Sequence, residues 1–134
     1  MPEALQAASE SIRLSPDSAY AYFCLGCALH EPETYGEAAA AYKKALELTP
    51  DQFEPRSNLG EIYLRLGQYD DALTAFLTAS KFSSNDAKLH YYLGEVYVRL
   101  GRREQASSEL QRLTELRDPL ADELAKLINS DSAN

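Results

Sequence analysis

The sequence predicts an all-α protein made of repeated antiparallel helix pairs. A Leu-Gly dipeptide recurs every 34 residues, beginning at Leu25, Leu59 and Leu93, and an alanine stands twelve residues after each glycine. Each copy also carries two apolar stripes at helical spacing. Because such a period marks a supersecondary unit that stacks on its neighbours, we expect a solenoid of helical hairpins.

The middle copy shows how each hairpin is encoded. Its two stripes are Leu59, Ile62, Tyr63 and Leu66, followed by Ala72, Ala75, Phe76 and Ala79. Gly67 lies between the stripes, and Gly101 lies at the same place in the next copy, where a left-handed glycine can end a helix. In the first copy Pro32 stops the helix instead. The expected helix starts are Thr34 with Glu37 as a capping box, Asp51 with Glu54, and Asn85 or Asp86.

These residues resemble the tetratricopeptide repeat family over nearly the whole chain. The family's small positions eight and twenty are matched by Gly26, Gly60 and Gly94, and by Ala38, Ala72 and Ala106. Small side chains at these positions let the two helices of a repeat cross closely. The resemblance implies a right-handed α-solenoid of antiparallel helix pairs. The sequence departs from the family pattern in having no tryptophan, in the Pro32 turn, and in carrying Leu113 in place of an alanine.

In this register the chain forms a single domain over residues 1–134. Residues 1–18 are half a repeat with a helix over 3–14, and three full repeats span 19–52, 53–86 and 87–118. Residues 119–129 form a capping helix and residues 130–134 a frayed tail, which gives eight helices in all. The apolar face of the first helix, which includes Leu5 and Ile12, lacks a partner helix and could form a homodimer.

The charge of the chain is acidic and uneven. Its 134 residues include 13 Lys and Arg against 21 Asp and Glu, a formal net charge of −8. This balance argues against nucleic acid and anionic membranes, since both repel an acidic protein. Residues 1–52 hold eight acidic and three basic side chains, so a basic ligand should favour the N-terminal half. With no secretory leader and no apolar run of about 20 residues, we expect a cytoplasmic protein.

Residues that could support catalysis or metal binding are few and scattered. Cys24 and Cys27 form a C-x-x-C pattern, but it lies in the middle of a helix, where neither a redox pair nor a four-ligand zinc site is expected. His30 is expected to bond a carbonyl at a helix end, and His90 to occupy a helix-packing position. No nucleophile elbow, phosphate loop or zinc-helix motif is present. We therefore expect no enzyme activity, metal or cofactor.

The resemblance also implies a ligand groove along the first helix of each repeat. The candidate groove residues are Tyr20, Phe23, Cys27, Glu54, Asn58, Glu61, Arg65, Lys88, Tyr91, Tyr92, Glu95 and Arg99. Aromatic residues gather at its two ends and carboxylates in its middle. For the four aromatic residues, exposure in the groove and burial between repeats both stay open.

An exposed aromatic set on a concave face favours protein binding. We expect a non-catalytic interaction scaffold that holds a peptide or helix of a partner protein. Replacing Phe23 and Tyr91 by alanine should then abolish capture with little change in folding. Two alternatives are a self-assembly unit joined through unpaired terminal helices and a small secretion-type chaperone.

One subtype of the family grips the acidic tails of heat-shock chaperones with five polar side chains. Asn58 and Lys88 match that set, whereas Phe23, Cys27 and Tyr92 replace its other members. We therefore expect no strong binding of such a tail.

Overall fold

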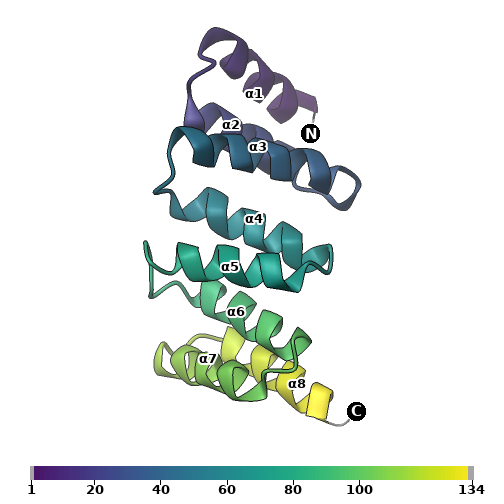
Figure 1. The fold of residues 1–134 in the computed structure, drawn as a ribbon, viewed down its shortest axis with the longest axis vertical. Helices are drawn as coiled ribbons and strands as arrows, with labels where there is room; N and C mark the ends of the chain where they lie inside the picture. Colours follow the sequence, from purple (N-terminus) through teal and green to yellow (C-terminus); the bar gives the residue numbers. More distant parts are fainter. Residues whose placement is uncertain (1, 133–134) are drawn as a thin grey trace.

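The computed structural model describes residues 2–132, and within them eight α-helices stack in chain order with no strand between them. Their bounds are α1 (Pro2–Leu14), α2 (Ala19–Ala28), α3 (Tyr35–Leu48), α4 (Phe53–Arg65), α5 (Tyr69–Ala79), α6 (Ala87–Arg99), α7 (Arg103–Glu115) and α8 (Leu120–Ser132). A 3-10 turn, Pro32–Thr34, precedes α3. The helices succeed one another along the long axis, with α1 and α8 at opposite ends of the stack (Figure 1). The predicted all-α solenoid is confirmed.

The helix pairs α2/α3, α4/α5 and α6/α7 make the most extensive contacts in the molecule. Their close crossing depends on glycine. A Cβ atom at Gly26 would lie 2.5 Å from the Tyr42 ring, and one at Gly60 would lie 2.8 Å from the Phe76 ring. Both rings are fully buried. The glycines therefore make room for an aromatic ring inside the first two of these hairpins.

The third repeat is closed in a different way. Opposite Gly94 lies Leu124 of α8, whose Cδ2 is 2.5 Å from the position of an added Cβ atom. Leu110 stands in this copy where the first two carry an aromatic ring, and it is only partly buried. Because leucine is smaller than tyrosine or phenylalanine, the following helix can fill the space. As a result α8 packs against both α6 and α7.

The C-terminal helix is longer than predicted. It runs from Leu120 to Ser132, so the frayed tail expected from residue 130 is wrong for residues 130–132, and residues 133 and 134 lie outside the described part. No glycine or proline follows Ile128 to stop the helix. Arg103 of α7 also donates a hydrogen bond to the Ile128 carbonyl, 3.1 Å from Nη1 to oxygen.

The predicted helix ends are partly confirmed. Gly67 and Gly101 adopt φ values of +78° and +74°, as expected for residues that end a helix. Asp86 caps α6 by accepting a hydrogen bond from the Leu89 amide at 2.9 Å. Arg117, which follows the second helix of the third repeat, also has a positive φ of +56°, and the sequence pattern did not reveal this.

Two predicted caps are wrong. The Thr34 hydroxyl donates to the Leu29 carbonyl at 2.6 Å, so it satisfies the end of α2 and does not cap α3. Asp51 does not cap α4 either, because that helix starts one residue later, after Gln52. Its third residue is Pro55, which has no N–H for a capping side chain to bond.

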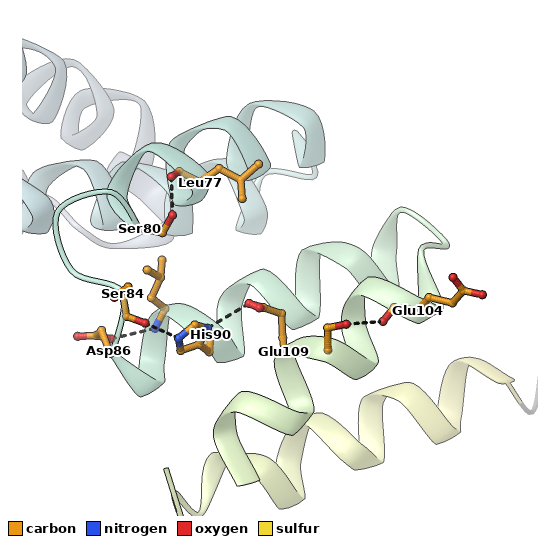
Figure 2. Close-up of polar contacts among 9 residues, drawn as sticks. Leu77, Ser80, Ser84, Asp86, His90, Glu104 and Glu109 are labelled. Atoms are coloured by element: carbon orange, nitrogen blue, oxygen red, sulfur yellow. Dashed lines mark hydrogen bonds and ion pairs between the residues drawn. The ribbon is translucent and has the colours of Figure 1, made fainter. Parts of the chain in front are cut away.

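His90 occupies a packing position, as predicted, and ties α6 to its surroundings. It is 7% exposed. Its Nε2 lies 2.7 Å from the Ser84 carbonyl, and its Nδ1 lies 3.0 Å from Oε1 of Glu109 on α7 (Figure 2). Since a carbonyl can only accept, Nε2 carries a hydrogen. His90 therefore links the α5–α6 loop to the following hairpin.

Candidate functional site

The candidate groove is the surface formed by α2, α4 and α6, the first helices of the three repeats. All twelve predicted residues lie on these helices. The structure connects them through ring contacts, hydrogen bonds and ion pairs that run from α2 to α6. They divide into a pocket at each end and a polar floor between them.

The N-terminal pocket is a cavity of about 500 Å³ between the starts of α2 and α4. It is lined by Ala19, Tyr20, Phe23, Ala45, Thr49, Gln52, Phe53, Glu54 and Pro55. Tyr20 is 74% exposed, and its ring lies 6.3 Å from the half-buried ring of Phe23. For Tyr20, the structure therefore selects exposure in the groove over burial between repeats.

The floor beside this pocket is organised by the hydroxyl of Tyr42, a residue of α3. It donates to the Cys27 sulfur at 3.7 Å and accepts from the Asn58 amide at 3.4 Å. His30 Nδ1 lies 2.9 Å from the same oxygen. Burial, followed by the contact with Cys27, raises the pKa of Tyr42 well above its ordinary value. The expectation that His30 bonds a helix-end carbonyl is therefore wrong: its ring instead faces the floor of the groove.

The same floor continues into the second and third repeats through Glu61. Its Oε1 lies 3.5 Å from His30 Nε2. Burial raises the pKa of Tyr92, and the nearby carboxylate of Glu61 raises it further. Glu61 therefore lies between a histidine of the first repeat and a tyrosine of the third.

Tyr92 and Glu95 are largely buried residues of the floor. They are 7% and 5% exposed, which corrects the expectation that Glu95 is a surface carboxylate and selects burial for Tyr92. Phe76 stacks on the Tyr92 ring at 5.4 Å. Arg65 binds Glu95 at 2.9 Å, with Arg99 at 4.0 Å, so two cations compensate the buried carboxylate.

The C-terminal pocket is a cavity of about 470 Å³ where α4 and α6 meet the start of α8. Its lining residues are Arg65, Asp86, Ala87, Lys88, Tyr91, Tyr92, Asp118 and Leu120. Lys88 is exposed, and its Nζ lies 5.9 Å from the centre of the Tyr92 ring. Tyr91 is half-buried and packs against two of the apolar clusters.

The chemistry of the groove gives no sign of a reactive centre. Partial desolvation of its sulfur raises the pKa of the Cys27 thiol, and the nearby carboxylate of Glu54 adds to this shift. A redox or nucleophilic cysteine needs the opposite shift. Within residues 2–132 no three His, Cys, Asp or Glu side chains are grouped so as to hold a metal ion. No helix of the described chain has the length and apolar composition needed to cross a bilayer.

Comparison with known proteins decides the family. The profile described as TPR repeat matches residues 33–67 and 60–101, and the profile described as tetratricopeptide repeat matches residues 87–118. Together these matches cover more than half of the chain. The chain belongs to the tetratricopeptide repeat family. Among proteins with curated descriptions, none matches it.

Solved structures of other repeat proteins share this fold. A MamA structure (AMB-1) is 27% identical over 84% of this chain, with a TM-score of 0.74. YrrB, described as a TPR protein with an unusual peptide-binding site, is 29% identical over 82% of this chain, with a TM-score of 0.76. This chain covers 61% of that MamA chain and 57% of that YrrB chain.

A third structure is more remote in sequence and shows the fold alone. It is the first TPR of Spaghetti (RPAP3), bound to the HSP90 peptide SRMEEVD. It is 23% identical, with a TM-score of 0.78, and the match covers 87% of this chain and 94% of that one. Two of these three structures are thus described as having a peptide site or a bound peptide.

Proposed function

We propose that this protein is a non-catalytic interaction scaffold that holds a peptide or helix of a partner protein along the candidate groove. The observation that carries the proposal is the pair of aromatic-lined pockets at the two ends of the groove. Exposed aromatic rings supply large contact area at low entropic cost. The peptide site described for YrrB supports a peptide partner.

The floor between the pockets supports the same proposal. The Tyr42 hydroxyl is already hydrogen-bonded with His30 and Asn58, and Glu61 lies 3.5 Å from His30, so a ligand need not order these side chains on binding. Pre-ordered side chains lower the entropic cost of association. A surface of this size is expected to bind a single peptide with a dissociation constant of about 1 to 100 μM.

The test must change the groove without changing the fold. Phe23 and Tyr91 are unsuitable, because both pack against apolar clusters and their removal would also destabilise the protein. Tyr20 and Lys88 are exposed and are better targets. We expect Tyr20→Ala combined with Lys88→Ala to lower capture of a partner at least ten-fold, with unchanged helicity and melting.

Phe82 and Lys81 provide the matched control. Both are exposed, both lie in the loop after α5, and neither lines the N-terminal or the C-terminal pocket. Phe82→Ala with Lys81→Ala should leave capture intact. Equal capture by both double variants, measured by pull-down with mass spectrometry, would show that binding does not use the groove.

Self-assembly is a second candidate, supported by a different surface. A cavity of about 530 Å³ lies between α1 and α2, lined on the α1 side by Ala4, Ala7, Ala8, Ser11 and Leu14. Leu14 is 67% exposed, whereas Leu5 packs against the buried cluster that contains Tyr42 and Ile62. Leu14→Asp should therefore dissociate any dimer formed through α1. Sizing at two protein concentrations tests this, and a monomer at both removes the candidate.

A further inference from the structure

We propose that the N-terminal pocket binds a basic side chain of the partner, an arginine in particular. This inference rests on the proposed function and names the chemistry of one end of the ligand. It combines three features of the pocket: two aromatic rings, one carboxylate and an apolar base.

The aromatic rings supply the first feature. Tyr20 presents a largely exposed ring and Phe23 a half-exposed one, tilted at 40° to each other with their centres 6.3 Å apart. A guanidinium group stacks on aromatic faces and is more weakly hydrated than an ammonium group. Two rings at an angle can contact both the face and the edge of such a planar cation.

The carboxylate of Glu54 is the second feature. It is the only charged group among the pocket's lining residues. It is exposed, and within residues 2–132 it forms no ion pair. Its charge contributes to raising the pKa of both Tyr20 and Cys27, after the larger effects of the Cys24 contact and of desolvation respectively. A carboxylate can accept two parallel N–H bonds from an arginine.

The base of the pocket is the third feature. Ala19, Ala45 and Pro55 line it, and Ala45 and Pro55 are buried. An apolar base fits the methylene stem of a long basic side chain, whose charged head then lies at the rim with Glu54.

Backbone dipoles do not reverse this preference. The starts of α2 and α4 face the pocket and carry partial positive charge. At α2 this charge is reduced, because the Ser18 hydroxyl accepts a hydrogen bond from the Ala21 amide. The end of α3, which also faces the pocket, contributes partial negative charge. Asp17 and Asp51 precede the two helices. The nearest basic residue in sequence, Arg56, donates to the Pro50 carbonyl at 3.1 Å and does not line the pocket.

The opposite end of the groove makes the choice of pocket specific. The C-terminal pocket contains Arg65 and Lys88, and its two aspartates each accept a backbone N–H bond at a helix start. With two basic and two acidic side chains in its lining, that pocket offers no net charge attraction to a cationic side chain. A bound peptide should therefore place its basic residue at α2 and α4.

The experiment uses the whole chain and a random dodecapeptide library displayed on phage, at about 0.15 M salt so that long-range attraction to the acidic protein is screened. The retained peptides should be enriched in arginine next to an apolar residue. For a synthetic retained peptide, changing that arginine to glutamine should lower affinity about ten-fold. When the protein carries Glu54→Gln, the arginine-to-glutamine change in the peptide should lower affinity two-fold or less.

Glu104→Gln is the matched control, because Glu104 is also exposed in the first turn of a helix, α7, but lines neither pocket of the groove. It should reproduce the ten-fold difference. Ring resonances of Tyr20 and Phe23 should shift on titration with the arginine peptide.

The outcomes separate the two proposals. Retention of no peptide would overturn the proposed function and this inference together. Retained peptides without basic residues, or with an acidic consensus, would overturn the inference alone. The same holds if Glu54→Gln weakens the arginine and glutamine peptides equally.

Discussion

Gly26 provides the sharpest test of how the helix pairs are held together. Gly26→Ala would place a methyl group 2.5 Å from Cε1 and 2.6 Å from Cδ1 of Tyr42. That ring cannot move freely, because it is fully buried and its hydroxyl contacts Cys27, His30 and Asn58. Overpacking of this kind costs about 1 to 3 kcal/mol. Replacing a glycine within a helix by alanine returns about 0.5 to 1 kcal/mol. We therefore expect a net loss of about 1 to 2 kcal/mol.

Urea unfolding followed by circular dichroism measures this loss. Gly36→Ala is the control, because Gly36 lies in α3 with nothing within 4 Å of an added Cβ atom. It should raise the free energy of unfolding by about 0.5 kcal/mol. In a Tyr42→Leu background, where the ring is gone, Gly26→Ala should become neutral or stabilising. A Gly26→Ala protein as stable as the wild type would refute the close-crossing explanation.

Three other perturbations probe the C-terminal helix, the tyrosines and the buried ion pair. Leu124→Ala should lower the free energy of unfolding, measured in urea, by about 3 kcal/mol, because it leaves a cavity at the fully buried site against Gly94. Lys126→Ala, the control on the same helix, should lower it by less than about 0.5 kcal/mol. Because the pKa values of Tyr42 and Tyr92 are raised, the folded state keeps protons that the unfolded state releases above a pH of about 10. The stability that these two tyrosines contribute should therefore be complete below that pH and fall above it. A near-ultraviolet titration in which all nine tyrosines of the folded protein ionise together near pH 10 would contradict this. Arg65→Ala should lower stability by about 1 to 2 kcal/mol at pH 7, since Glu95 stays buried with only Arg99 at 4.0 Å, and adding Glu95→Gln should restore part of the loss.

The repeat, the helix pairs and the left-handed turns could be predicted from the sequence because each depends on local residue types at a fixed interval. Gly26 and Gly60 lie at the helix crossings, and Gly67 and Gly101 have positive φ. The packing of Leu124 against Gly94 could not be predicted in this way. It depends on the volume left by Leu110 and on the angle at which α8 returns.

The candidate groove was predicted only as a set of helix positions. Periodicity gives the face on which Tyr92 and Glu95 lie, but their burial depends on Phe76 and Arg65, which approach from the second repeat. His30 and Tyr42 were missed as floor residues. The signal for Tyr42 was its hydroxyl: a buried tyrosine needs hydrogen-bond partners, and phenylalanine fills the same place in the second repeat. Which polar residues supply those partners is set by three-dimensional distance alone.

The two ends of the stack differ in how firmly they are anchored. Among the described helices, α1 packs mainly against α2, whereas α8 packs against both α6 and α7. Transient local opening is cheapest where an element has the fewest buried neighbours, so hydrogen exchange should be fastest in α1 and its protection should increase toward α6. Tyr20 lies on α2, directly beside this loosest element. A partner that contacts Tyr20 would therefore bind beside the helix that opens most easily, whereas its other end would contact the more firmly packed helices α6 and α8.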